Sequence, residues 1–141
     1  MQHHQSVNLQ VCESDRLSFL PDLFGEDFMA AEMQVYALAD QYFTGYNGGF
    51  WHFIRLQNGG GYMAPDCDKV HLINGENWFD KTVSGDAAGI ILTSMAINRR
   101  CWQHHDKGDA GLVELFIQRE EQLWSFIESH PECSEIYRAL D

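Results

Sequence analysis

The stretch Phe50–Ala64, FWHFIRLQNGGGYMA, contains the strongest fold signal in this chain of 141 residues. Aromatic and aliphatic residues dominate its first half, which is typical of a strand. The run Asn58–Gly61 is a strong turn signal, and the apolar residues after it indicate a second strand. Two further short strands are predicted at residues 70–73 and 79–83. Residues 50–83 are therefore expected to form a small antiparallel sheet of three to four strands.

About four helices are expected to pack with this sheet, some before it and some after it in the sequence. Residues 26–43 contain no Gly or Pro and are apolar almost all round, which predicts a helix covered on several sides. A second helix is expected over residues 87–101, with a cap from Ser84 or Asp86. A third is predicted at residues 112–129, and a short last helix follows Pro131.

Strands inserted between helices, without regular βαβ alternation, predict an α+β fold. The length fits one compact domain, which we expect to span residues 14–141. The polar residues 1–13 are expected to be a flexible N-terminal tail. Gly89 lowers helix propensity, so we expect it to permit close backbone packing.

The net charge of the chain limits the classes of molecule that it is expected to bind. The chain has 21 acidic and 9 basic residues, and its formal net charge is -12. Such a surface repels phosphate backbones, so direct binding to nucleic acid or to an anionic membrane is not expected. A basic protein partner is permitted, although acidity also serves solubility alone. No run approaches the ~20 apolar residues of a membrane span, and no secretory signal is recognisable, so a cytoplasmic location is expected.

One face of the predicted third helix is acidic. Glu114, Glu121 and Glu128 recur every seven residues and form a stripe with roughly 10 Å between neighbours. The stripe permits partial DNA mimicry, but duplex DNA carries charge at a far higher density. A solvated helix face is the simpler interpretation. Arg119 and Glu120 project from the opposite, apolar arc, where they are expected to snorkel or to pair with buried polar groups.

Metal ligation has little support, and we expect neither a metal nor a cofactor. The four cysteines form no Cys-x-x-Cys pair and are expected to be free thiols; they are Cys12, Cys67, Cys101 and Cys133. His104 and His105 follow Cys101 closely. Adjacent helical residues point about 100° apart, so this spacing is poor for one metal ion.

Catalysis also has weak support. Cys67 and His71 could supply a thiol and a base, but on a strand they would lie about 13 Å apart. The sequence has no phosphate-binding loop, nucleophile elbow or zinc-protease motif. We expect the protein not to be an enzyme, with a thiol hydrolase of unknown substrate as the alternative. Among the four tryptophans, Trp78 in a turn-rich segment is expected to be the most exposed.

Several motifs resemble, in the same order along the chain, those of the ArdB/KlcA antirestriction proteins. They are Phe19–Gly25, Gly48–Phe53, Asn58–Pro65, Val83–Ile90 and Ile136–Asp141. The sequence is most similar to the ArdB branch of that family. Two positions, Trp78 and Lys81, depart from the small residues expected there, so contacts through that loop are not carried over.

The resemblance implies a compact α+β protein of plasmids and other mobile elements. It implies protection of incoming DNA from host type I restriction–modification enzymes, and it supplies no catalytic centre. We therefore expect relief of type I restriction through protein contacts with the host restriction–modification complex, direct or indirect. A partial DNA mimic and an enzyme of unknown substrate are the alternatives. The oligomeric state is not predicted.

Four polar positions within the family-like motifs are the predicted protein-contact residues: Asn77, Ser84, Glu132 and Asp141. Each also has a structural interpretation, as a turn residue, a helix cap, a first-turn acid and a chain end respectively. Asp141 is included because its side chain and the terminal carboxylate of this sequence would bring two negative groups together.

Overall fold

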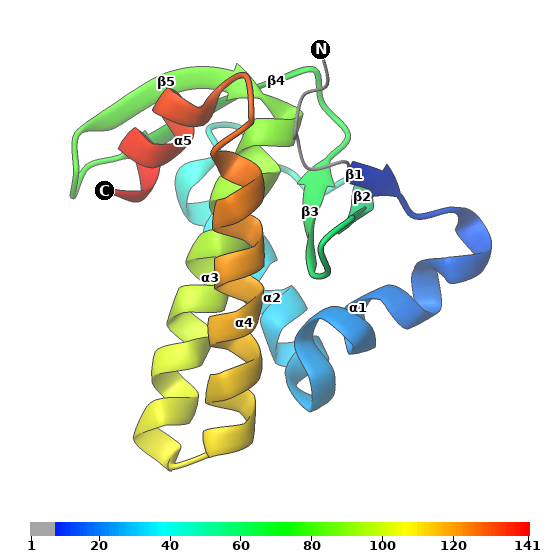
Figure 1. Ribbon diagram of the computed structural model, residues 1–141. Helices are drawn as coiled ribbons and strands as arrows, with labels where there is room; N and C mark the ends of the chain where they lie inside the picture. The colour runs from blue at the N-terminus through cyan, green and yellow to red at the C-terminus, as the bar shows by residue number, and fades with distance from the viewer. Residues whose placement is uncertain (1–7) are drawn as a thin grey trace.

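Two antiparallel sheets lie against a long central helix, α3 (Gly85–Lys107), in the computed structural model, which describes residues 8–141 (Figure 1). The first sheet has the order β1–β2–β3, and β4 pairs with β5 in the second. The strand bounds are β1 Asn8–Gln10, β2 Trp51–Leu56, β3 Gly61–Pro65, β4 Lys69–Asn74 and β5 Phe79–Ser84. The predicted α+β class is confirmed.

The structure has one more α-helix than expected. The remaining helices are α1 Arg16–Phe24, α2 Phe28–Tyr42, α4 Ala110–Ile127 and α5 Cys133–Leu140, with 3-10 turns η1 at Glu13–Asp15 and η2 at Gly25–Asp27. The additional element is α1, which contains Pro21. Proline removes one backbone donor, and a helix of nine residues can close without that single bond.

The strands of residues 50–83 form two sheets instead of one continuous meander. Pro65 ends β3, and residues 66–68 lead the chain away before β4 begins. The segment after α2 lies along β4 instead: Phe43 forms a bridge with Leu72, and the Thr44 N–H donates to the His71 carbonyl at 3.0 Å. Pairing between residues far apart in sequence therefore divides the predicted sheet.

Part of the expected tail is ordered structure. β1 pairs with β2 in the register Gln10 to Ile54, and it covers the β2 edge that would otherwise be open. Val11 is buried and its N–H donates to the Phe53 carbonyl at 2.7 Å. Residues 8–13, which were expected to belong to the tail, thus include a strand paired with β2, and residues 1–7 lie outside the described part of the chain.

Close contact between α3 and β3 fixes the centre of the fold. A Cβ atom at Gly89 would lie 2.4 Å from the Met63 carbonyl oxygen, so only glycine allows this approach. The Thr93 side chain completes the seam, because its Oγ1 accepts from the Met63 N–H at 3.1 Å. The predicted role of Gly89 is confirmed, and α3 is held at a defined depth. Beyond it, α4 runs back alongside α3 (Figure 1).

Candidate functional site

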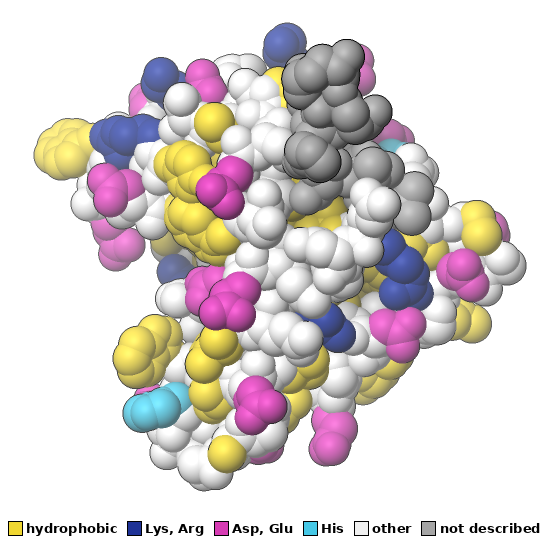
Figure 2. All heavy atoms as spheres, viewed as in Figure 1, with side chains coloured by type: hydrophobic (Ala, Val, Ile, Leu, Met, Phe, Trp, Pro, Cys, Tyr) yellow, Lys and Arg dark blue, Asp and Glu magenta, His cyan; other side chains and the backbone are white. Residues whose placement is uncertain are grey.

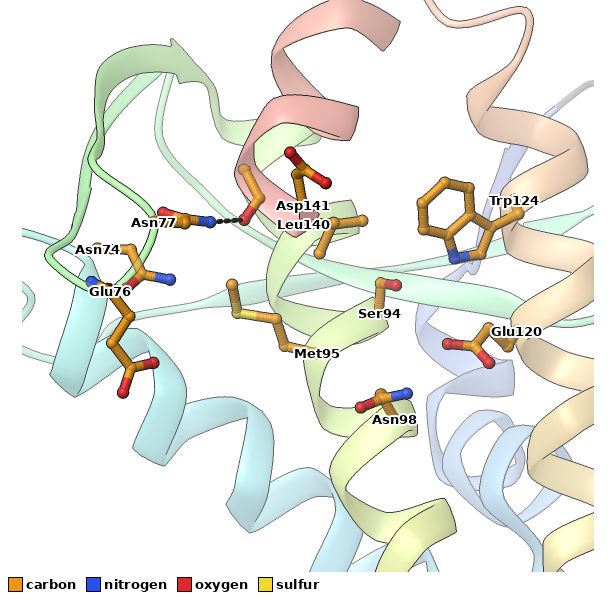
Figure 3. A pocket seen from close by; sticks show the side chains of 11 residues that line it. Asn74, Glu76, Asn77, Ser94, Met95, Asn98, Glu120, Trp124, Leu140 and Asp141 are labelled. Carbon is orange, nitrogen blue, oxygen red and sulfur yellow. Dashed lines mark hydrogen bonds between the residues drawn. The ribbon is translucent and has the colours of Figure 1, made fainter.

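A cavity of about 370 Å³ opens where the β4–β5 turn, α3, α4 and α5 meet (Figure 3). Ser94 and Asn98 project from α3 between the turn on one side and Glu120 and Trp124 of α4 on the other. The complete lining is Asn74, Glu76, Asn77, Ser94, Met95, Asn98, Glu120, Trp124, Ala139, Leu140 and Asp141.

Three of the four predicted contact residues hold the wall of this cavity together. Asn77 donates from Nδ2 to the Ala139 carbonyl at 2.8 Å, which ties the β4–β5 turn to the last turn of α5 (Figure 3). At the other end of α5, the Glu132 carboxylate accepts from the Ser84 N–H at 3.0 Å. Ser84 also caps α3, since its Oγ accepts from the Ala87 N–H at 3.0 Å.

Asp141 occupies a different place from the other three. It is exposed and lines the cavity at its rim, directly after α5. The structure therefore brings Asn77 and Asp141 to one end of α5, whereas Ser84 and Glu132 lie at the other end. The geometry assigns supporting positions to Asn77, Ser84 and Glu132 and leaves Asp141 open to solvent.

Negative charge faces the cavity without a basic side chain to balance it. Glu76, Glu120 and Asp141 line it, and among residues 8–141 no Lys, Arg or His does so. Burial raises the pKa of the half-buried Glu120, a hydrogen bond with Asn98 lowers it in part, and the net direction is upward. Ionised Glu120 is thus less favourable in the folded protein than in water.

Ser94 contributes an unused polar group. The residue is only 3% exposed and lines the cavity, yet its hydroxyl has no hydrogen-bond partner within the described chain. The hydroxyl opens into the cavity and is not sealed in the core, so it is available to a group that enters there.

A second polar cluster joins β3, α3 and the segment before α5. The Tyr62 hydroxyl donates to Asp86 Oδ1 at 2.5 Å, and His130 Nε2 lies 2.8 Å from Asp86 Oδ2. The Glu132 N–H donates to His130 Nδ1, so Nε2 carries the ring hydrogen and donates to Asp86. Burial would raise the pKa of Asp86, but these hydrogen bonds outweigh it and hold the pKa below its ordinary value.

A third cluster lies deep between η2 and α3. Arg100 donates to Asp27 through Nε at 2.8 Å and Nη2 at 2.7 Å. His104 Nε2 lies 3.0 Å from Asp27 Oδ2. Burial would raise the pKa of Asp27, but Arg100 and His104 lower it further than burial raises it.

This third cluster separates the residues of the Cys-x-x-His-His motif. His104 faces Asp27, whereas His105 is exposed beside Trp102. Residues 8–141 contain no group of three or more potential metal ligands. The Cys67 thiol is exposed in the loop before β4, and His71 is instead paired with Asp80 at 2.5 Å.

The acidic stripe lies where the helical spacing placed it. Glu114, Glu121 and Glu128 are all exposed along α4. Acidic side chains on the face shown in Figure 2 occur singly or in small groups among hydrophobic and neutral ones. On the opposite arc, Arg119 donates to the carbonyls of Leu23 and Asp22 at 2.9 and 2.8 Å, and so caps the end of α1.

The cavity itself was not predicted from the sequence. Glu120 gave a signal, because it is a carboxylate within an apolar helical arc, but its neighbours across the cavity are remote in sequence. Ser94 gave no such signal, since serine is common in helices.

The tryptophan expected to be exposed is confirmed as such. Trp78 is 85% exposed, and its backbone has a φ of 62° in the turn that follows Asn77. None of the described helices is long and apolar enough to cross a membrane.

Known proteins resemble this chain over its whole length. Residues 44–141 match the family model described as "Antirestriction protein". A protein of Escherichia coli (strain K12) named "Putative antirestriction protein YubI" is 64% identical over 141 residues, covering 100% of both chains. The "Antirestriction protein KlcA" of Escherichia coli is 39% identical, covering 96% of this chain and 93% of that protein.

A solved structure gives the same result in three dimensions. It is 35% identical, covers 100% of both chains and has a TM-score of 0.86. It is described as showing that the KlcA and ArdB proteins have a novel fold and "antirestriction activity against Type I DNA restriction systems in vivo but not in vitro". The chain described here belongs to the antirestriction protein family.

Proposed function

We propose that this protein relieves type I restriction of incoming DNA in the cytoplasm, and that it does so by contacting proteins. The observation that carries the proposal is the full-length match, at a TM-score of 0.86, to a structure whose proteins act against type I systems in vivo. Neither catalysis nor binding to DNA is part of the proposed mechanism.

The description "in vivo but not in vitro" of the solved relatives bears on the mechanism. A protein that occupies the DNA site of the restriction enzyme needs only the purified enzyme as its partner. An activity that is seen only in cells favours a further cellular protein as the contact. It therefore supports protein contact over mimicry of DNA.

The charge distribution supports the same conclusion. The net charge of -12 opposes binding to DNA, which itself carries one negative charge per about 1.7 Å of duplex. The stripe of Glu114, Glu121 and Glu128 contributes one charge per two helical turns, roughly 10 Å. Such a sparse row is a poor substitute for the phosphates, and it fits a solvated helix face better.

Within the predicted contact set, we assign the direct contact to Asp141. It is exposed at the cavity rim. The polar atoms of Asn77, Ser84 and Glu132 instead form hydrogen bonds within the protein that hold α5 and the start of α3 in place. These three are positioning residues in the proposal, and their replacement would act by loosening the wall that carries Asp141.

The test is relief of restriction in cells that contain a type I system, measured as the efficiency with which unmodified DNA is established. The wild-type protein is expected to raise that efficiency. Variants with Cys67→Ala, or with Gln at all three stripe positions, are expected to retain relief. Loss of relief on neutralising the stripe would favour mimicry, and loss with Cys67→Ala would favour a thiol enzyme.

A second measurement addresses the contact itself. Affinity capture from the same cells, at physiological salt, is expected to recover a component of the restriction system or a host protein that acts on it. Simultaneous replacement of Asn77, Ser84, Glu132 and Asp141 with relief unchanged would remove the site assignment. A wild-type protein that gives no relief would overturn the proposed function as a whole.

A further inference from the structure

We propose that the cavity between α3, α4, α5 and the β4–β5 turn binds the guanidinium group of an arginine side chain presented by the partner protein. The inference deepens the proposed function and rests on it, because it identifies which chemical group of a protein partner the site would recognise. It begins from three observations: the negative charge around the cavity, the unpaired hydroxyl of Ser94 that opens into it, and the chemistry of the lining residues.

The charge around the cavity calls for a cation. Glu76, Glu120 and Asp141 reach it from three different elements, and within residues 8–141 no basic side chain lines it. Glu120 is the least exposed of the three, and its pKa is raised by burial and by the nearby charge of Glu121. An arriving cation would remove that disadvantage and bind through a charge-assisted hydrogen bond.

The Ser94 hydroxyl is the independent observation that points to a ligand. Ser94 is only 3% exposed. Its hydroxyl faces the cavity, and no described residue forms a hydrogen bond with it. Figure 3 shows it between Trp124 and Met95, above Asn98 and opposite Glu120. A bound donor would satisfy this hydroxyl and the Glu120 carboxylate together.

The cavity is lined by both polar and apolar side chains, which favours a guanidinium group over a metal ion or an ammonium group. Guanidinium offers five N–H groups in one plane, and the cavity supplies acceptors of three kinds: carboxylate, hydroxyl and the amide oxygens of Asn74 and Asn98. Met95, Trp124 and Leu140 provide apolar surface for the methylene stem. A volume of about 370 Å³ suits a side chain better than a bare ion.

The neighbouring turn offers the surface on which a protein would rest. Trp78 is 85% exposed and holds a φ of 62°, which a non-glycine residue adopts only at a cost. It follows Asn77, whose side chain fixes the turn to α5. Tryptophan is one of the residue types enriched among the interface residues that contribute most to binding.

The binding test uses a probe that carries only the proposed group. N-acetyl-arginine amide is titrated into the full-length protein, and the backbone and Trp124 indole signals are followed by NMR. Saturable shifts confined to the cavity residues are expected, and the neutral citrulline analogue should produce none. Glu120→Gln should weaken probe binding by about tenfold, as loss of a charged hydrogen bond does, and Ser94→Ala should weaken it less.

A matched control is available next to Glu120. Glu121→Gln removes the same charge from the adjacent, exposed position; because the Glu121 charge acts on Glu120 only at a distance, probe affinity and restriction relief are expected to change far less than with Glu120→Gln. A thermal melt of each variant separates loss of binding from loss of fold. Absence of probe binding, or equal affinity of the wild-type protein and Glu120→Gln, would overturn the cavity assignment.

The cellular assay decides whether the group belongs to the partner. Loss of both probe binding and restriction relief in Glu120→Gln supports the inference. Loss of probe binding with full relief would overturn the assignment to a partner's arginine, while the proposed function would stand on the wild-type result. Failure of the proposed function is a different outcome, in which the wild-type protein itself gives no relief.

Discussion

Two buried or half-buried carboxylates, Asp27 and Glu120, meet opposite surroundings in this molecule. Asp27 accepts two hydrogen bonds from Arg100 and faces His104, and its pKa is lowered. Glu120 has Asn98 as its neighbour, shares its cavity with two more acids, and has a raised pKa. The first carboxylate contributes to folding. The second has no basic side chain beside it among residues 8–141, and we propose that it receives a cationic group from a partner.

The largest expected effect lies at the paired site. Arg100→Met would leave the Asp27 carboxylate buried without its main partner, and we expect a loss of about 3 kcal/mol in the free energy of unfolding. Urea denaturation at neutral pH measures it. A matched change at the exposed Arg138 should have almost no effect. Equal losses for the two variants would contradict the distinction.

A smaller loss is expected at the Asp86 cluster. Asp86→Asn removes the charge that accepts from Tyr62 and His130, and should lower the free energy of unfolding by about 2 kcal/mol.

The pH dependence of this variant gives a second readout. Because the folded pKa of Asp86 lies below its ordinary value of 3.8, its contribution is complete above that pH. The contribution is lost as the pH falls through the folded pKa. Denaturation curves of both proteins between pH 7 and 2 should therefore converge at the acid end. A constant gap over that range would be inconsistent with the low pKa.

A mutation in the wall of the cavity is expected to lower the free energy of unfolding less than a mutation in either cluster. Asn77→Ala frees the Ala139 carbonyl at the end of α5 and should cost about 1 kcal/mol. The loss should be local, so amide hydrogen exchange in α5 should accelerate more than in α3. Asn47→Ala, at an exposed position before β2, is the control. Uniform acceleration across both helices would argue against a local role.

At Glu120 we expect the opposite effect, a gain in the free energy of unfolding when the charge is removed. A raised pKa means that Glu120 disfavours the folded state increasingly as the pH rises from 4.5 through its folded value. Glu120→Gln removes this penalty, and since the residue is half exposed we expect a gain of only about 0.5 kcal/mol at pH 7. Thermal melts at pH 4 and pH 7 measure the difference. A clear destabilisation at pH 7 would show that Glu120 is a structural residue.

Local sequence patterns predicted the local features of the fold and little of the site. The cap at Ser84, the close packing at Gly89 and the exposed stripe on α4 follow from the order of neighbouring residues, and all three are present. The division into two sheets depends on Phe43 meeting Leu72, which no local pattern contains.

Long-range placement also explains why the candidate site was missed. Asp27 and Arg100 are 73 positions apart, and the cavity exists only because α5 lies across the β4–β5 turn. Periodicity identified Glu120 as a polar residue on an apolar arc, but it could not show whether a partner faces it. Asn77 was chosen from the resemblance and interpreted as a turn residue; its hydrogen bond to the Ala139 carbonyl, 62 positions away, was not predicted.

The most direct test of the contrast between paired and unpaired charge is restriction relief by Glu120→Gln in cells with a type I system, at protein levels matched to the wild type. We expect relief to fall by about tenfold, the loss of one charged contact, while Glu121→Gln retains it. Full relief by Glu120→Gln would contradict the claim that this carboxylate is kept for a partner.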